Sequence, residues 1–443
     1  MQPRILLLNP PVYDFSAYDF WLKPYGLLSV AGRLRGKAEL RLFDFLDRFS
    51  PYLPPPEKKL RIDAWGRGEF HSRPAERPIE FSSIPRRYMR FGAPREAFRK
   101  FLQSEKSFDA VLIQTTMTYW YPGLREVIAD LREISARTRI VLGGVYATLC
   151  PAHAQSLGAD LVVDGLNLDP LWNFLQLEPD HAALPFWDDY TQLETGVQKL
   201  ADGCPFKCTY CSVPQVYPRF QMRPLERSIA ELRNLAHRGV KHIAFYDDAL
   251  LYQPHRILIP YLKEVLRSGI RVNFHTPNAM NARFISKELA ALMVEAGFKI
   301  VYLGFESSAY EWQKKTGGKV YSDELARAIE NLVAAGADIS HIHAYLIMAH
   351  PQNEQQNVEA SMHYANSLGI RVMLAEFSPI PGTPDGELCR KWVDLDEPLF
   401  HNKTAFPYFS LGETEVNRIK QLCRALNARH GQPTARLPVA HTK

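Results

Sequence analysis

Three cysteines within eight consecutive positions, Cys204, Cys208 and Cys211, constrain this chain more than any other feature. Spacers of three and two residues let three thiolates converge on one side of a folded loop, as an iron–sulfur cube requires. A structural zinc site would want a fourth ligand nearby, and the other cysteines are far away in sequence. The pattern predicts a [4Fe-4S] cluster with three protein ligands and one open iron. The alternative is three buried cysteines that act as small hydrophobic residues.

An aromatic residue, Tyr210, directly precedes the last of these cysteines. With it, the Cys-x-x-x-Cys-x-x-Cys pattern resembles that of the radical S-adenosylmethionine (SAM) enzymes. The resemblance implies that the open iron binds the amino and carboxylate groups of SAM, with Tyr210 among the SAM-binding residues. It also implies an external electron donor, such as flavodoxin or ferredoxin, whose electron splits SAM to a 5′-deoxyadenosyl radical.

Downstream of the cysteines, short apolar runs alternate with amphipathic segments as far as about residue 385. Six strand–helix units predict an open, partial (β/α)6 barrel rather than a closed eightfold one. The expected core spans residues 195–385, and the resemblance to radical SAM enzymes covers the same range. The expected strands are 195–200, 242–246, 272–274, 301–306, 343–348 and 371–377.

Two of these strands end in polar residues that the resemblance assigns to SAM. Tyr246, Asp247 and Asp248 follow the second strand, where the family binds the SAM ammonium group. Glu306 and Ser307 end the fourth strand, where the family approaches the ribose or carboxylate of SAM. The alternative for the aspartates is that they cap the next helix.

Residues 1–180 also alternate between strands and helices, which predicts a doubly wound parallel sheet with ligands beyond the carboxyl ends of its strands. This region resembles the cobalamin-binding domain that precedes many radical SAM cores. The resemblance rests on Asn9-Pro10-Pro11, Pro24-Tyr25-Gly26-Leu27-Leu28, Thr115-Thr116-Met117 and Leu142-Gly143-Gly144.

The resemblance implies that Thr115, Thr116, Met117, Gly143 and Gly144 bind cobalamin. A Gly-Gly pair after a strand is, as an alternative, a tight turn. The Asp-x-His-x-x-Gly motif that supplies an axial histidine in other cobalamin proteins is absent. We therefore expect cobalamin without a histidine ligand, or a domain that is an empty relic.

Residues 51–100 interrupt this domain with eight prolines and with twelve Lys/Arg against six Asp/Glu. So many prolines exclude a regular helix or a central strand. One interpretation is a solvated insertion that wraps the domain. The other is a lid whose Arg86, Arg87, Tyr88 and Arg90 meet anionic groups.

The remaining segments are a linker at residues 181–194 and a short C-terminal extension at 386–443, with a helix at 413–428 and a disordered tail. His341, His343 and His350 flank one strand and are expected to be ordinary polar residues at the barrel mouth, although His350 could face substrate.

A chain of 443 residues with 46% hydrophobic composition predicts two or three domains. Six cysteines, three of them in one motif, favour a reducing compartment over a disulfide scaffold. We find no apolar run of membrane-spanning length and expect a cytoplasmic protein. The net charge of +5 is too small to imply nucleic acid, so a small-molecule substrate is expected.

The expected reaction is reductive cleavage of SAM and abstraction of hydrogen from an unactivated carbon. With cobalamin, the resemblance implies C-methylation. Without it, rearrangement, ring formation or carbon–carbon coupling is as plausible. Methylthiolation of tRNA would require further N-terminal cysteines and a basic C-terminal module, which this sequence lacks. A non-catalytic cobalamin carrier or sensor is the alternative from another class.

Overall fold

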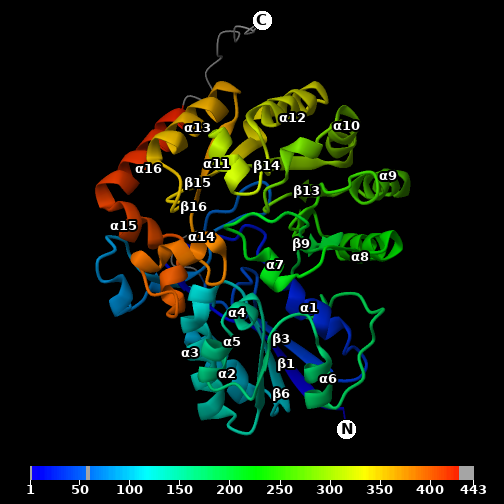
Figure 1. The fold of residues 1–443 in the computed structure, drawn as a ribbon. Helices are drawn as coiled ribbons and strands as arrows, with labels where there is room; N and C mark the ends of the chain where they lie inside the picture. The colour runs from blue at the N-terminus through cyan, green and yellow to red at the C-terminus, as the bar shows by residue number, and fades with distance from the viewer. Residues whose placement is uncertain (1, 56–59, 429–443) are drawn as a thin grey trace, which may run out of the picture.

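The computed structural model describes residues 2–55 and 60–428 and contains two parallel β-sheets, one in each half of the chain (Figure 1). The tail predicted to be disordered lies outside the described residues. Helices cover both faces of the first sheet and the outer face of the second. The predicted α/β fold, with a doubly wound sheet followed by a partial barrel, is confirmed.

The first sheet has the strand order β3-β1-β6-β7-β8, and every pair is parallel. Its order reverses between β1 and β6, which is the topological switch point where such sheets bind ligands. The strands are β1 (Arg4–Asn9), β3 (Glu39–Asp44), β6 (Ala110–Thr115), β7 (Arg139–Gly144) and β8 (Leu161–Val163). The flanking helices are α1 (Tyr25–Gly32), α2 (Arg95–Ser104), η2 (Thr118–Trp120), α3 (Tyr121–Ile134), α4 (Val145–Leu149), α5 (Pro151–Ser156) and α6 (Asp169–Leu175).

The two faces of this sheet belong to different hydrophobic cores, because neighbouring residues of a strand point to opposite sides. Leu6 and Leu8 of β1 pack with α2 and α3 in one core. Ile5 and Leu7 pack with α1 in a core that continues into the barrel. The two halves of the chain therefore share one hydrophobic core.

The proline-rich insertion forms a small antiparallel sheet of β2 (Val12–Asp14), β5 (Met89–Phe91) and β4 (Ser72–Pro74), with η1 (Ile79–Phe81). The expectation of no regular helix in residues 51–100 is wrong at the end of that range, because Pro94 directly precedes α2 and proline is tolerated there. Arg90 is buried in an ion pair with Glu126 at 2.7 Å, so the anionic partner of this arginine is the protein's own carboxylate.

The barrel is a parallel sheet in the sequential order β9 to β16 and is open between its two edge strands. Its strands are β9 (Thr195–Gln198), β12 (His242–Phe245), β13 (Asn273–His275), β14 (Phe298–Glu306), β15 (Ile342–Met348) and β16 (Arg371–Glu376). The helices around it are α8 (Leu225–His237), α9 (Leu258–Ser268), α10 (Lys287–Ala296), α12 (Ser322–Ala334), α13 (Gln355–Ser367) and α16 (Glu413–Ala428). Shorter elements connect them, namely β10 (Ala201–Asp202), α7 (Val213–Val216), β11 (Gln221–Met222), η3 (Ala282–Phe284), α11 (Tyr310–Lys315) and η4 (Ile339–His341).

Residues of the first half close the amino-terminal end of the barrel and form what we call the barrel floor: Trp21, Trp65, Gly66 and Arg67. The Trp21 ring stacks on His275 at 4.2 Å, and its Nε1 donates to the Trp65 carbonyl. Arg67 donates to the Tyr302 hydroxyl at 2.7 Å. The insertion is thus built into the barrel rather than only wrapped around the first domain.

The C-terminal extension bridges the two halves through α14 (Pro384–Glu387), η5 (Leu388–Lys391), η6 (Pro398–His401) and α15 (Phe406–Leu411). Tyr121 donates to Glu397 at 2.9 Å, and the buried Asn402 donates to Asp14 at 3.0 Å. A hydrogen bond of 2.9 Å joins His401 to Thr118. In the described part of the chain, the search for a helix with the length and hydropathy of a membrane span finds none.

Candidate functional site

A cavity of about 340 Å³ lies at the carboxyl end of the barrel and brings together residues from distant parts of the sequence. Its lining includes the three motif cysteines and Tyr210, Asp247, Asp248 and Glu306. The predicted metal ligands and four of the six predicted SAM residues therefore face one space. Apolar groups such as Phe206, Leu251 and Met280 complete the wall.

The cysteine loop is held by main-chain contacts with the loop after α11. Thr209 N donates to the Thr316 carbonyl at 3.3 Å. Gly317, with φ of +120°, lies so close that a Cβ there would be 3.1 Å from the Cys208 Cα. A side chain at Gly317 would displace the loop, so glycine is required by both conformation and space.

The three thiols suit a cluster better than a single ion. Burial raises the pKa of Cys211 to about 11, so a cation must be present to hold it as a thiolate. Among the described residues, no three His, Cys, Asp or Glu side chains converge on one metal ion. A cube does not need such convergence, because each cysteine binds a different iron. Three half-buried thiols on one cavity wall fit this donor set.

Asp247 and Asp248 have different surroundings. The Asp247 carboxylate accepts hydrogen bonds from Leu200 N at 2.9 Å and Ala201 N at 2.7 Å, which ties the end of β12 to the end of β9. Burial raises the pKa of Asp247 to about 7, although these donors oppose the shift. The alternative that the pair caps a helix is wrong, because α9 begins only at Leu258.

Asp248 carries the polar atom that this cavity leaves unsatisfied. Its buried Oδ2 has no hydrogen-bond donor in the described chain, and Lys199 Nζ is 3.8 Å away. The Nδ2 of Asn281, which lines the same cavity, also lacks an acceptor. An unpaired acceptor and an unpaired donor on two residues that line one cavity fit a ligand such as SAM, which carries both an ammonium and a carboxylate.

Lys319 is a site residue that sequence reasoning missed. It lines the cavity and pairs with Glu306 at 3.0 Å, and the negative charges of Glu306 and Cys208 raise its pKa although burial, the largest single influence, acts to lower it. A Cβ on Gly304 would lie 2.7 Å from Lys319 Nζ, so this glycine makes room for the pair. Glu306 has φ of +67°, where β14 shifts register, and such strain concentrates at functional sites. The sequence signal was a lysine directly after Gly317-Gly318.

Two predicted SAM residues, Tyr246 and Ser307, lie outside the cavity lining. The Tyr246 hydroxyl donates to the Trp21 carbonyl at 2.6 Å and so anchors the barrel floor. Ser307 is fully buried, and its carbonyl accepts a hydrogen bond from Gln313 Nε2.

Two of the three histidines lie away from the barrel mouth, whereas His350 follows the carboxyl end of β15. His341 and His343 lie at the floor end of β15 and not at the barrel mouth. His341 contacts Trp65, and His343 stacks on Tyr302. His350 is buried between Trp312 and Phe377 and does not line the cavity.

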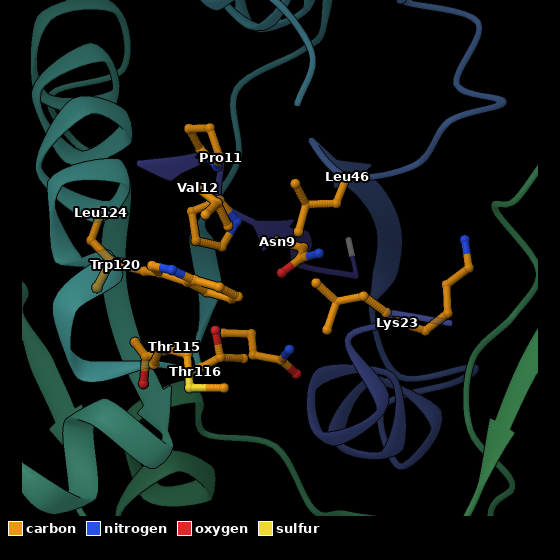
Figure 2. Close-up of a pocket in the computed structure, with 13 residues that line it drawn as sticks. Asn9, Pro11, Val12, Lys23, Leu46, Thr115, Thr116, Trp120 and Leu124 are labelled. Atoms are coloured by element: carbon orange, nitrogen blue, oxygen red, sulfur yellow. The ribbon is translucent and has the colours of Figure 1, made fainter. Parts of the chain in front are cut away.

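A second cavity marks the switch point of the first sheet. Residues 9–12 at the end of β1 and 114–117 at the end of β6 line it, with Lys23, Leu46 and Trp120. Figure 2 shows Thr115, Thr116 and Trp120 on one side, Leu46 and Lys23 on the other, and Asn9 between them. Thr115, Thr116 and Met117 therefore meet there. Gly143 and Gly144, one strand further along the sheet, do not line this cavity.

Cobalamin can fit only on the exposed surface at this edge of the sheet and not inside the cavity. The enclosed volume of about 20 Å³ has room for one water, so a corrin ring does not fit inside. Met117, 46% exposed, and Val145, 36% exposed, leave an apolar surface beside Gly143 and Gly144. A Cβ on Gly143 would meet only Val163, at 3.8 Å, whereas one on Gly144 would lie 2.3 Å from the Thr115 carbonyl. Gly143 therefore leaves space in which a ligand could approach the backbone. Gly144 must be glycine because a side chain there would clash with the neighbouring strand β6. No histidine lines the cavity.

Comparison with known proteins agrees with these observations. Residues 199–365 match the model of the Radical SAM superfamily. The radical S-adenosylmethionine methyltransferase TsrM from Kitasatospora setae, solved with tryptophan substrate and a SAM analogue, has the same fold with a TM-score of 0.67 at 15% identity. The match covers 96% of this chain and 89% of that one. Another structure of TsrM, with cobalamin and a [4Fe-4S] cluster bound, gives a TM-score of 0.63 at 16% identity over 88% of this chain and 75% of that one.

Curated relatives match over shorter spans. An uncharacterized methyltransferase, PH0819 of Pyrococcus horikoshii, is 28% identical over 193 residues, which is 42% of this chain and 40% of that protein. The ribosomal protein uS12 methylthiotransferase RimO of Moorella thermoacetica is also 28% identical over 193 residues, 42% of this chain and 44% of that protein. The chain therefore spans less than half the length of these two relatives.

Proposed function

We propose that this chain, whose residues 199–365 form a radical SAM domain, binds a [4Fe-4S] cluster through Cys204, Cys208 and Cys211 and uses SAM to abstract hydrogen from an unactivated carbon. The cluster supplies the electron and SAM the radical, and the protein supplies position and exclusion of water. The observation that carries this proposal is the shared cavity, which the three motif cysteines line together with Asp248, a residue whose Oδ2 has no hydrogen-bond donor in the described chain.

Two oppositely charged side chains bind the two charged groups of SAM in this proposal. Asp248 offers a buried carboxylate oxygen to the ammonium. Lys319 offers a cation to the carboxylate, and the same charge offsets the negative thiolates beside it. Glu306 holds Lys319 in place at 3.0 Å and is itself fixed by the irregular end of β14.

We further propose that the reaction is cobalamin-dependent C-methylation of a small molecule. Three observations support this: the switch point at β1 and β6, the exposed apolar edge beside it, and the fold likeness to TsrM, whose structure was solved with cobalamin. Methylthiolation, the activity named for RimO, gains no support from the other cysteines. Cys150, Cys389 and Cys423 lie in three separate parts of the fold.

Reconstitution with hydroxocobalamin is expected to load about one cobalt per chain, and the Co(II) paramagnetic resonance spectrum should lack nitrogen splitting from the protein, because the sequence lacks the Asp-x-His-x-x-Gly motif that supplies an axial histidine. Gly143→Leu should lower cobalt retention, since it fills the open space at that strand end. Gly143→Ala serves as the mild control. Substoichiometric cobalt in the wild type would contradict the proposed methylation and favour a cobalamin-free radical reaction. Nitrogen splitting would show that a histidine of the protein binds the cobalt.

We also propose that an acidic electron-transfer protein, such as flavodoxin or ferredoxin, docks over the cysteine loop. The exposed Gly317 packs directly on the Cys208 backbone, so the cluster ligand lies just beneath the surface there. Lys207, Lys314 and Lys315 are exposed around this point. Basic groups at the rim of a contact mainly accelerate association with an acidic partner.

Replacing Lys207, Lys314 and Lys315 together by Glu should slow cluster reduction by reduced flavodoxin by about tenfold or more at low salt, because rim charges steer encounter. Reduction by dithionite, which needs no docking, should be unchanged. The control replaces three exposed lysines elsewhere, Lys100, Lys106 and Lys287, in the same way. Equal slowing by both triple variants, or no slowing by either, would remove this surface as the docking site.

A further inference from the structure

A buried chain of hydrogen bonds joins the cysteine loop to α14, at the start of the C-terminal extension. Asp385 Oδ2 accepts from the Thr209 hydroxyl and from His350 Nε2, the latter at 2.9 Å. Asp385 N also donates to the Thr209 carbonyl at 3.2 Å. Thr209 directly follows Cys208, so one residue of α14 holds both the side chain and the backbone of the cysteine loop.

The direction of each hydrogen bond follows from the donors around His350. Trp312 Nε1 and the Gln352 backbone N–H both donate to His350 Nδ1, at 3.3 and 3.2 Å. A ring nitrogen that accepts carries no proton, so Nε2 is the protonated nitrogen and donates to Asp385. The His350 side chain is 0% exposed and that of Asp385 is 5% exposed. A carboxylate buried to this degree needs both of its donors, because an unpaired one is costly.

The same network fixes the next residue of the loop. The Tyr210 ring lies parallel to that of Trp312, with centroids 6.3 Å apart, and its other neighbour is the edge of His350 at 6.1 Å. Thr209 and Tyr210 are the two residues between Cys208 and Cys211. Both are therefore held by groups outside the cysteine motif.

We propose that Asp385 is a positioning residue for the iron–sulfur cluster, which acts through Thr209 to fix Cys208 relative to Cys211. The inference rests on the proposed cluster. In the described chain, Asp385 is hydrogen-bonded to Thr209 and His350 and not to the sulfur of a motif cysteine, and its role is to keep the loop in the shape that three cluster ligands require. The helix α14, where the core meets the C-terminal extension, is then part of the cluster site.

Thr209→Val and Asp385→Asn are expected to lose iron to a chelator about tenfold or more faster than the wild type, because the first removes a hydrogen bond to a buried carboxylate and the second removes the charge that strengthens that bond. Thr209→Ser keeps the hydroxyl and should retain iron like the wild type. Asp385→Asn should also raise the cluster's reduction potential, because it removes a negative charge nearby, whereas Thr209→Val keeps that charge and should shift the potential less. The readouts are iron release, paramagnetic resonance spectra and redox titration.

Asp396→Asn is the matched control, because Asp396 lies in the same extension but is 81% exposed. The double variant Thr209→Val/Asp385→Asn should add little to either single variant, since both substitutions act on the same contact. Equal iron release from Thr209→Val and Thr209→Ser would overturn the inference. If Asp385→Asn does not fold, the comparison of Thr209→Val with Thr209→Ser is sufficient to test the inference. A wild type that assembles no cluster would overturn the cluster assignment itself, and the two failures are thus distinguishable.

Discussion

Cys208→Ala is expected to assemble no stable [4Fe-4S] cluster and to form no 5′-deoxyadenosine from SAM. Cys208 lies in the middle of the motif, and among the described cysteines only the three of the motif line the cavity, so no other cysteine is placed to replace its thiolate. With three protein ligands in total, the loss of one leaves two irons unsupported. Cys204→Ala and Cys211→Ala should behave alike. The measurements are iron content, the visible absorbance of the cluster, and SAM cleavage under anaerobic reducing conditions.

Cys423→Ala is the control for this prediction. Cys423 is buried on α16, where its Sγ is 3.7 Å from the Val372 carbonyl and remote from the cavity. It should keep both the absorbance and the cleavage activity. SAM cleavage by Cys208→Ala at the wild-type rate would end the radical SAM assignment.

Asp248→Asn is expected to raise the dissociation constant of SAM roughly ten- to a hundredfold without loss of iron. Asp248 lines the cavity, its Oδ2 has no hydrogen-bond donor in the described chain, and a hydrogen bond to a charged group contributes about 1.5–3 kcal/mol. Each 1.4 kcal/mol corresponds to about a tenfold change in affinity. Equilibrium binding of SAM to the reconstituted protein measures the effect.

Asp247→Asn makes the matched comparison, because the two aspartates are adjacent and only their contacts differ. An amide oxygen at position 247 can still accept from Leu200 N and Ala201 N, so SAM binding should stay close to that of the wild type. Wild-type affinity in both variants would show that the pair is structural. Weakened binding in Asp247→Asn alone would reverse the roles assigned here.

Local patterns predicted much of this fold from the sequence. The helix expected at residues 413–428 is α16 with those bounds, because its apolar positions recur at helical spacing and Gly412 precedes it. The barrel strands were predicted to within a few residues, since each is a short apolar run between polar loops. The motif cysteines and both aspartates were assigned to one site, because loops after parallel strands meet at one edge.

Contacts between distant segments could not be predicted in the same way. Lys319 reaches the cysteines only through the fold of the α11 loop, and nothing adjacent to it in sequence marks it as a partner of Glu306. Asp385 follows Cys208 by more than 170 residues, and its bond to Thr209 depends on how the C-terminal extension packs. The sequence shows where a strand ends but not which way each side chain points, and Tyr246 lies outside the cavity lining.

The barrel floor bears on how such a protein can be recombined in evolution. Trp21 and Trp65, which both belong to the first half of the chain, close the amino-terminal end of the barrel. Arg67, two residues after Trp65, contacts Tyr302 of the barrel. If two relatives exchanged their N-terminal halves, the barrel would therefore receive a new barrel floor together with the new N-terminal domain. Successful hybrids must inherit the residues facing Trp21, Trp65 and Arg67 as a set, so the two halves are constrained to diverge together.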